Sequence, residues 1–222
     1  MQTPATQTDF HRLTQRYTGP TAEQYDERRA GTVKWQREQE IVERLLSRLP
    51  AGASLLDIPV GTGRFLTLYR RFGIVATGMD VSADMLARAR EKDPEVQLRV
   101  GDIRRVAAGD REYDCALCVR FLNWVDGDGL RRAVRELARV SRRHIILGVR
   151  HYAPSTTLTL RRRLRQQWVR WQPKTVGQLV IHEHALIHEA FRQAGLVIQS
   201  ASPVEQSPDG TDYHIFHLTT SA

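Results

Sequence analysis

The fold is decided by a strand-to-helix turn that reads Leu56-Asp57-Ile58-Pro59-Val60-Gly61-Thr62-Gly63. An apolar run of strand length, residues 54–58, ends in this turn, and a helical pattern follows it to about residue 71. The two glycines let the backbone approach a ligand closely, and the start of the helix offers free N–H groups. The stretch therefore predicts a buried strand that leads into a ligand-binding turn.

Outward from this turn, short apolar runs alternate with helical patterns along the rest of the chain. The predicted strands are 54–58, 74–79, 96–100, 113–119, 144–149, 196–200 and 213–218. The predicted helices are 21–49, a helix ending near 71, 83–92, 129–140 and 181–194. Crossovers that are long enough for a helix favour parallel pairing. We expect an α/β fold, a doubly wound, Rossmann-like and mostly parallel sheet of about seven strands with helices on both faces.

The chain of 222 residues, 41% of them apolar, is long enough for one large core. We expect a single domain. Residues 1–50 form an N-terminal arm and helical cap, 51–149 and 181–222 form the Rossmann-like core, and 150–180 form a basic helical lid insertion.

Two acidic residues follow neighbouring strands of the expected sheet. Asp57 precedes Gly61 by four positions, and Asp80 closes the next strand, where a carboxylate suits the two hydroxyls of a ribose. A dinucleotide fingerprint needs a third glycine at the position of Leu66, so that motif fails.

Three motifs in order resemble those of the class I S-adenosylmethionine-dependent methyltransferases. They are Leu56-Asp57-Ile58-x-x-Gly61-Thr62-Gly63, then Gly78-Met79-Asp80-Val81-Ser82-x-x-Met85-Leu86, then Gly101-Asp102. The resemblance implies that S-adenosylmethionine is bound, that S-adenosylhomocysteine is the product, and that no metal is needed. One departure is Pro59, where the family usually has glycine and where proline lacks an N–H.

By the same resemblance, Asp57 and the loop through Pro59 to Gly63 hold the methionine moiety, and Asp80 takes the ribose hydroxyls. The adenine is framed by residues near the next strand ends. The implied cofactor-binding residues are Asp57, Pro59, Gly61, Thr62, Gly63, Met79, Asp80, Asp102, Ile103 and Val119. Tyr17 or Tyr25 of the N-terminal helices is a further candidate for a cofactor contact.

Three residues after the fourth and fifth predicted strands are candidates for the acceptor side of the site. Arg120 is suited to an anionic acceptor, and Asn123 to orienting a polar one; packing of the turn is the alternative for both. His151 is the candidate general base, because it follows the fifth predicted strand, at the sheet edge where ligands bind, and its pKa range suits proton transfer. A packing or surface histidine is the alternative.

Positive charge is concentrated in one segment. The chain has 33 Lys and Arg against 25 Asp and Glu, and residues 137–182 contain ten basic residues and no acidic one. Within it, 157–171 forms a basic amphipathic helix with Leu160, Leu164, Trp168 and Trp171 on one face. This helix is a lid over the acceptor pocket, a contact for phosphorylated lipid, glycan or a membrane surface, or a contact for RNA phosphates.

Two further patterns are interpreted as structural. His182-Glu183-His184-x-x-x-His188 is not the His-Glu-x-x-His zinc motif, and only His184 and His188 share a helix face. Cys115 and Cys118 lie three residues apart in a predicted strand, hence on opposite faces, so they belong to the core.

The sequence thus predicts a methyltransferase that acts on an oxygen or nitrogen of a small or amphiphilic metabolite, anionic or phosphorylated acceptors included. The alternatives are an RNA methyltransferase, in which the arginine-rich segment holds phosphates, and a catalytically silent S-adenosylmethionine-binding partner protein. A transient membrane-surface contact is compatible with the basic helix, and nucleic acid ranks below a metabolite. No secretory signal or membrane span is visible, so we expect a cytoplasmic protein. The oligomeric state is not readable from the sequence.

Overall fold

The computed structural model describes residues 18–19, 26, 31–152, 179–207 and 210–221. Its seven strands form one sheet in the order β3-β2-β1-β4-β5-β7-β6, in which the first five are parallel and β7 is antiparallel to both neighbours. The strands are β1 (Ser54–Asp57), β2 (Val75–Asp80), β3 (Gln97–Val100), β4 (Tyr113–Cys118), β5 (Ser141–Tyr152), β6 (Leu196–Gln206) and β7 (Thr211–Thr220). The doubly wound α/β prediction is confirmed.

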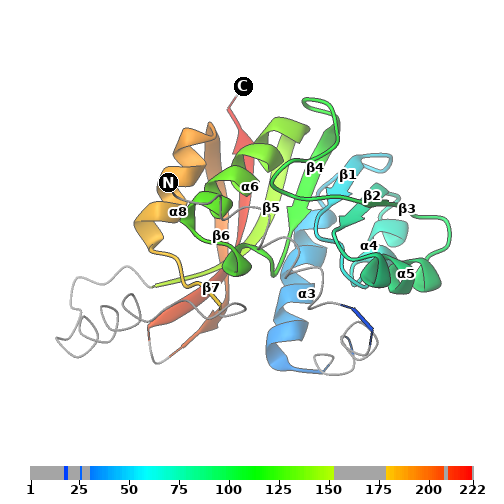
Figure 1. Cartoon of the computed structure of the whole chain (residues 1–222), viewed down its shortest axis with the longest axis horizontal. Coiled ribbons are helices and arrows are strands. Elements are labelled where there is room, and N and C mark those ends of the chain that lie inside the picture. Colours follow the sequence, from blue (N-terminus) through cyan, green and yellow to red (C-terminus); the bar gives the residue numbers. More distant parts are fainter. Residues whose placement is uncertain (1–17, 20–25, 27–30, 153–178, 208–209, 222) are drawn as a thin grey trace, which may run out of the picture.

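Helices cover both faces of this sheet (Figure 1). The described helices are α3 (Val33–Leu46), α4 (Leu66–Arg71), α5 (Ala83–Lys92), the 3₁₀ turn η1 (Leu122–Trp124), α6 (Gly127–Val140) and α8 (His184–Gln193). Local sequence explains where they begin, because the hydroxyl of Ser82 accepts from the N–H of Met85 and that of Thr32 from the N–H of Trp35. None of the helices in the described residues is both long and apolar enough to cross a membrane.

The sheet separates two apolar cores. One joins α6 and α8 to one face and contains Leu56 and Cys118, and the other joins α3, α4 and α5 to the opposite face and contains Leu55 and Cys115. The two cysteines are therefore buried on opposite sides of the sheet, as their spacing in a strand requires.

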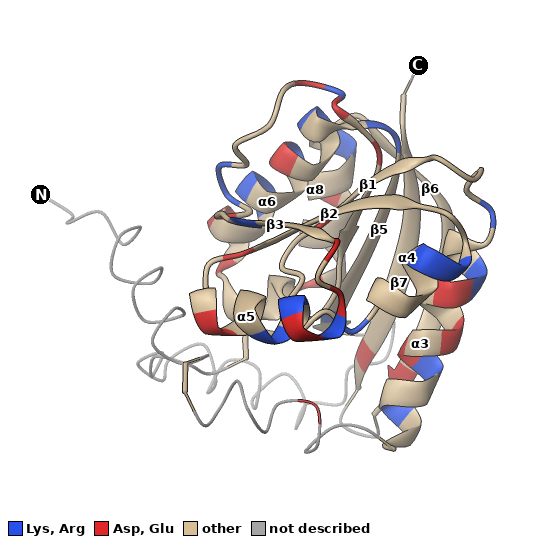
Figure 2. Cartoon of the chain, turned by 90° about the vertical axis from the view of Figure 1, so that its right-hand side faces the viewer, with Lys and Arg blue, Asp and Glu red and all other residues tan. Residues whose placement is uncertain are grey.

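Helices α3 and α5 contain charged residues of both signs, whereas the charged residues of α4 are both arginines (Figure 2). The segment in which positive charge is concentrated, residues 137–182, lies elsewhere in the sequence. Of the predicted arm, cap and lid, residues 1–17, 20–25, 27–30 and 153–178 lie outside the described residues, and with them Tyr17, Tyr25 and the predicted basic helix.

Several boundaries differ from the prediction, and the end of the fifth strand is the one that affects the site. The fifth strand was expected to end at residue 149, but β5 continues to Tyr152, because Arg150, His151 and Tyr152 pair with β7. Side chains alternate along a strand, so Arg150 and His151 point to opposite faces of the sheet. This alternation separates two residues that the sequence places together.

Candidate active site

A cleft of about 880 Å³, with the space open to solvent included, lies at the carboxyl ends of β1, β2 and β4. The predicted cofactor residues that line it are Asp57, Pro59, Gly61, Thr62, Asp80, Ile103 and Val119. Parallel pairing brings these strand ends to one edge, since Asp57 is in register with Gly78 of β2 and Leu117 of β4.

Asp57 places a buried carboxylate in this cleft. Its Oδ2 accepts a hydrogen bond from the hydroxyl of Tyr69 at 2.7 Å, and the structure gives the other oxygen no hydrogen bond from a described residue. The pKa of Asp57 is raised to about 7, chiefly by burial; the Tyr69 hydrogen bond lowers this pKa and the charge of Asp80 raises it. A cationic ligand group that reaches this carboxylate would stabilise its charged form.

Asp80 holds the turn that follows β1. Its Oδ2 accepts from the N–H of Gly61 at 2.9 Å, and its Oδ1 accepts from the N–H of Ser82 at 2.9 Å. Burial nevertheless raises the pKa of Asp80 above its usual value. Gly61 has φ of 56°, a conformation that favours glycine, and nothing lies within 4 Å of the position that a Cβ would take. The turn therefore leaves open space beside the two acids.

Three predicted cofactor residues do not line the cleft. Met79 alternates with Asp80 along β2 and packs into the core beneath α6. The carboxylate of Asp102 pairs with Arg104 at 2.9 Å, and Gly63 packs against Leu66. Pro59 does line the cleft, after a cis peptide bond to Ile58.

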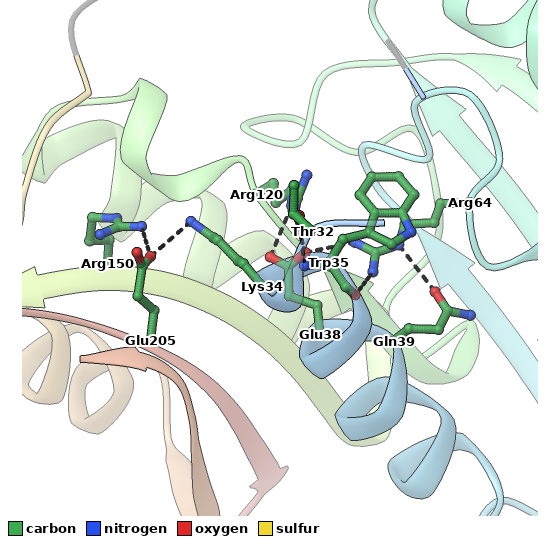
Figure 3. A network of polar contacts seen from close by, with 9 residues as sticks. All are labelled: Thr32, Lys34, Trp35, Glu38, Gln39, Arg64, Arg120, Arg150 and Glu205. Carbon is green, nitrogen blue, oxygen red and sulfur yellow. Dashed lines mark hydrogen bonds and ion pairs between the residues drawn. The ribbon is translucent and has the colours of Figure 1, made fainter. Parts of the chain in front are cut away.

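Arg120 lies at the end of β4 in a buried charge network with α3 (Figure 3). The carboxylate of Glu38 has no exposed surface and is shared by Arg120 and Arg64, with Arg64 Nη1 at 2.6 Å from Oε2. The guanidinium of Arg64 lies 3.6 Å from the ring centroid of Trp35. Both arginines line the cleft, and their hydrogen bonds hold the pKa of Glu38 below its usual value although burial opposes this.

A second cavity, of about 730 Å³, adjoins the first through two residues that line both, Arg120 and Trp124. The other described residues lining it are Thr32, Lys34, Asn123, Arg150, Leu179 and Tyr213. The two cavities together provide one compartment beside the acids of β1 and β2 and another on the α3 side of β5 and β7.

Asn123 is built into the wall of this second cavity. Its Nδ2 donates to the carbonyl oxygens of Arg150 at 2.7 Å and Val180 at 2.6 Å, and its Oδ1 accepts from the N–H of Arg150 at 2.7 Å. These bonds fix the backbone from which the Arg150 side chain projects. Its predicted role in orienting the acceptor stays a prediction.

His151 lines neither of these cavities. It is buried on the α8 face of β5, where its Nδ1 lies 2.9 Å from the carbonyl oxygen of Tyr152 and its Nε2 lies 3.1 Å from Nδ1 of His214. A carbonyl oxygen only accepts, so Nδ1 of His151 carries the proton and Nε2 accepts from His214. The expectation that His151 overlooks the site assumed a loop, whereas the extension of β5 turns its side chain to the other face.

The remaining histidines of the sequence motif gather near His151. The rings of His184 and His188 lie 4.0 Å apart, and Nε2 of His182 lies 2.8 Å from the carbonyl oxygen of Leu122. No set of three or more potential ligands in the described part of the chain is arranged to hold a metal ion.

Sequence reasoning missed Glu38, Arg64 and the cation Lys34. One signal was available: Glu38 lies on the same helical face as Ile41, Val42 and Leu45, which are all buried. An acidic residue on an apolar stripe indicates a buried partner of opposite charge.

Part of the chain is similar in sequence to known methyltransferases. A family model described as methyltransferase domain matches residues 56–147. The chain is 38% identical over 102 residues to a malonyl-[acyl-carrier protein] O-methyltransferase of Pectobacterium atrosepticum, which covers 45% of this chain and 40% of that protein. It is 41% identical over 106 residues to a dTDP-3-amino-3,6-dideoxy-alpha-D-glucopyranose N,N-dimethyltransferase of Streptomyces fradiae, covering 46% and 41%.

The chain thus spans about two fifths of the length of these curated relatives. Among solved structures, it resembles magnesium protoporphyrin IX methyltransferase from Synechocystis PCC 6803 with bound S-adenosylmethionine. That comparison has a TM-score of 0.73 at 16% identity and covers 99% of this chain and 100% of the other. At this identity the likeness concerns the fold.

Proposed function

We propose that this chain is a class I S-adenosylmethionine-dependent methyltransferase, and that it transfers a methyl group to an oxygen or nitrogen of a small or amphiphilic molecule. The methyltransferase-domain match over residues 56–147 and the likeness in fold support this proposal. The observation that carries this proposal is the pair of buried acids, Asp57 and Asp80, on one cleft beside the open turn at Gly61. The adjoining second cavity supplies a separate compartment for the acceptor.

The residues present fit S-adenosylmethionine. When bound, it supplies a methyl group on a positively charged sulfur. Asp57 would hold the ammonium of the methionine moiety, and Asp80 would accept from the ribose hydroxyls while it holds the Gly61 turn. Ile103 and Val119 supply apolar walls for the adenine.

Transfer of this kind is an in-line displacement, so the protein contributes chiefly by alignment of the two reactants. Arg120 and Trp124 line both cavities and form the boundary across which acceptor and donor would meet. A carboxylate or an uncharged amine is nucleophilic without a general base. Transfer to such an acceptor therefore does not require a histidine in the cleft.

A labelling experiment tests the proposal. The purified chain is incubated with radiolabelled methyl donor and an extract of its source organism, and products are separated into small-molecule, organic-soluble and acid-precipitable fractions. We expect label in the small-molecule or organic fraction. Label confined to ribonuclease-sensitive polymer would contradict a metabolite acceptor, and binding of S-adenosylhomocysteine without any transfer would indicate the catalytically silent alternative.

A further inference from the structure

The second cavity has a cationic wall. Lys34, Arg120 and Arg150 line it, and none of its described lining residues is acidic. The carboxylates that pair with these cations, Glu38 and Glu205, are not among the lining residues. The charged side chains among the described lining residues are therefore all positive.

Sheet register explains how this wall is built. Arg150 of β5 is paired with Tyr213 of β7, which is paired in turn with Glu205 of β6. Residues directly opposite on neighbouring strands point to the same face, so these three side chains form one row across the sheet. The first turn of α3 places Lys34 beside Arg150 and Glu205 of that row (Figure 3). Nζ of Lys34 lies 4.8 Å from the centroid of the Tyr213 ring.

The two cations Lys34 and Arg150 outnumber the one carboxylate, Glu205, with which they pair. Glu205 Oε2 lies 2.5 Å from Arg150 Nη2 and 3.3 Å from Lys34 Nζ, so one carboxylate is shared by two cations. The pKa of Lys34 is lowered, chiefly by burial and then by the charge of Arg150, although Glu205 opposes both.

The N-terminus of α3 adds to the positive potential in the second cavity. The first turn of α3 contains no acidic residue, and its N-cap Thr32 lines the cavity beside Lys34. A helix N-terminus carries partial positive charge and favours anions. In addition, residues 153–178, which follow β5 in the chain, include no Asp or Glu.

We propose that Lys34 and Arg150 bind an anionic group, a carboxylate or a phosphate monoester, on the small-molecule acceptor. This inference rests on the proposed function, because it assigns the second cavity to the acceptor. Glu205 already shows that a carboxylate fits between the two cations, and it competes with the acceptor for them. Asn123 acts as a positioning residue, because its amide bonds to both the N–H and the carbonyl oxygen of Arg150.

The test uses four probes of equal chain length: hexanoate, hexyl phosphate, hexan-1-ol and hexylamine. Each is titrated by calorimetry into the full chain in the presence of S-adenosylhomocysteine. We expect both anions to bind at least about tenfold more tightly than the alcohol and the amine. The alcohol lacks the charge-assisted contact, and the protonated amine is repelled by the two cations. The stronger of the two anions identifies a carboxylate or a phosphate as the natural group.

Variants connect the binding to the two cations. Lys34→Gln and Arg150→Gln should each weaken the anions about tenfold, and Arg150→Lys should retain more of the affinity than Arg150→Gln. Glu205→Gln should tighten anion binding, because it removes the competing carboxylate. The matched control, Arg192→Gln, removes an exposed arginine that pairs with Glu189 on α8 and should change nothing.

Equal binding of all four probes, or unchanged anion affinity in both Lys34→Gln and Arg150→Gln, would overturn the proposal. Binding of polyuridylate but not of the hexyl anions, lost in the same variants, would also overturn it, in favour of a polyanion. Binding of S-adenosylhomocysteine is recorded separately for each protein. Its absence would contradict the proposed function, whereas its presence without discrimination among probes would contradict this inference alone.

Discussion

The carboxylate of Glu38, wholly buried in α3, accepts hydrogen bonds from Nε of Arg120 at 2.9 Å on Oε1 and 2.7 Å on Oε2. Arg120 has φ of 65°, a left-handed conformation that is uncommon for a residue with a side chain. The ion pair therefore ties the N-terminal helix to a strained position at the boundary of the two cavities. The position of α3 therefore affects where the Arg120 side chain lies in the walls of both cavities.

Glu38→Gln should destabilise the protein by about 3–5 kcal/mol, because it leaves two arginines partly buried without their shared carboxylate. Urea denaturation measures the loss. The control is Glu91→Gln, which breaks an exposed pair with Arg88 and should cost less than about 1 kcal/mol. A loss of similar size in both variants would show that the buried network contributes little.

Cofactor binding should depend on pH through Asp57. Its pKa of about 7 in the free protein means that the carboxylate is mostly protonated at pH 6 and mostly charged at pH 8. Because an ammonium ligand needs the charged form, affinity for S-adenosylhomocysteine should rise about tenfold between these values. Asp57→Asn should bind more weakly at pH 8 and show a flat profile. An equal slope in that variant would assign the titration to another group.

Asp80→Ala should reduce affinity for S-adenosylhomocysteine by more than about tenfold, since it removes both the proposed ribose contact and the support of the Gly61 turn. A 2′,3′-dideoxy analogue separates the two effects: the wild type should prefer the natural compound, and Asp80→Ala should not. Asp102→Ala is the control, because Asp102 does not line the cleft. Preserved discrimination in Asp80→Ala would refute the ribose contact.

His151→Gln tests the predicted general base. Since its ring faces α8 and bonds to His214, we expect the pH profile of methyl transfer to keep its shape, while thermal stability falls. The measurement is the rate of transfer from pH 5.5 to 9 at saturating cofactor. Loss of the pH dependence in the variant would restore His151 to the chemistry.

The histidine cluster should make the fold sensitive to acid. Burial and the neighbouring histidines lower the pKa of His184 to about 4, below the value near 6.5 of an unfolded chain. A base with a lowered pKa contributes its full stability above about pH 6.5, and this stability is lost as the pH falls toward 4. The melting temperature should therefore decrease from pH 7 to pH 5, and less steeply in His184→Phe. Parallel slopes would show that His184 is not the responsible group.

Much of the fold was predictable because its signals are local. The helix at 83–92 has its cap at Ser82 and its end at Asp93 within its own sequence, and both boundaries agree with the prediction. The cofactor cleft was predictable for a related reason: parallel strands that each end in an acid or a glycine bring those ends to one edge. Asp57, Gly61 and Asp80 therefore lie together as expected.

The second cavity was less predictable, because its wall depends on the pairing of β5 with antiparallel β7. Pairing with β7 prolongs β5 beyond residue 149 and thereby assigns Arg150 to one face and His151 to the other. A shift of a strand's end by three residues is invisible in a pattern of apolar residues, yet it determines which side chain reaches a cavity.

The sequence by itself determined the order of strands and helices, the acids and glycines at the strand ends, and the segment in which positive charge is concentrated. Only the tertiary structure decided the pairing of charges. Glu38 pairs with Arg120, which is 82 positions away in the sequence, and Arg150 pairs with Glu205, which is 55 positions away. Charged side chains lack a periodic signal that identifies their partners, so those partners emerge only when the sheet and α3 are packed together.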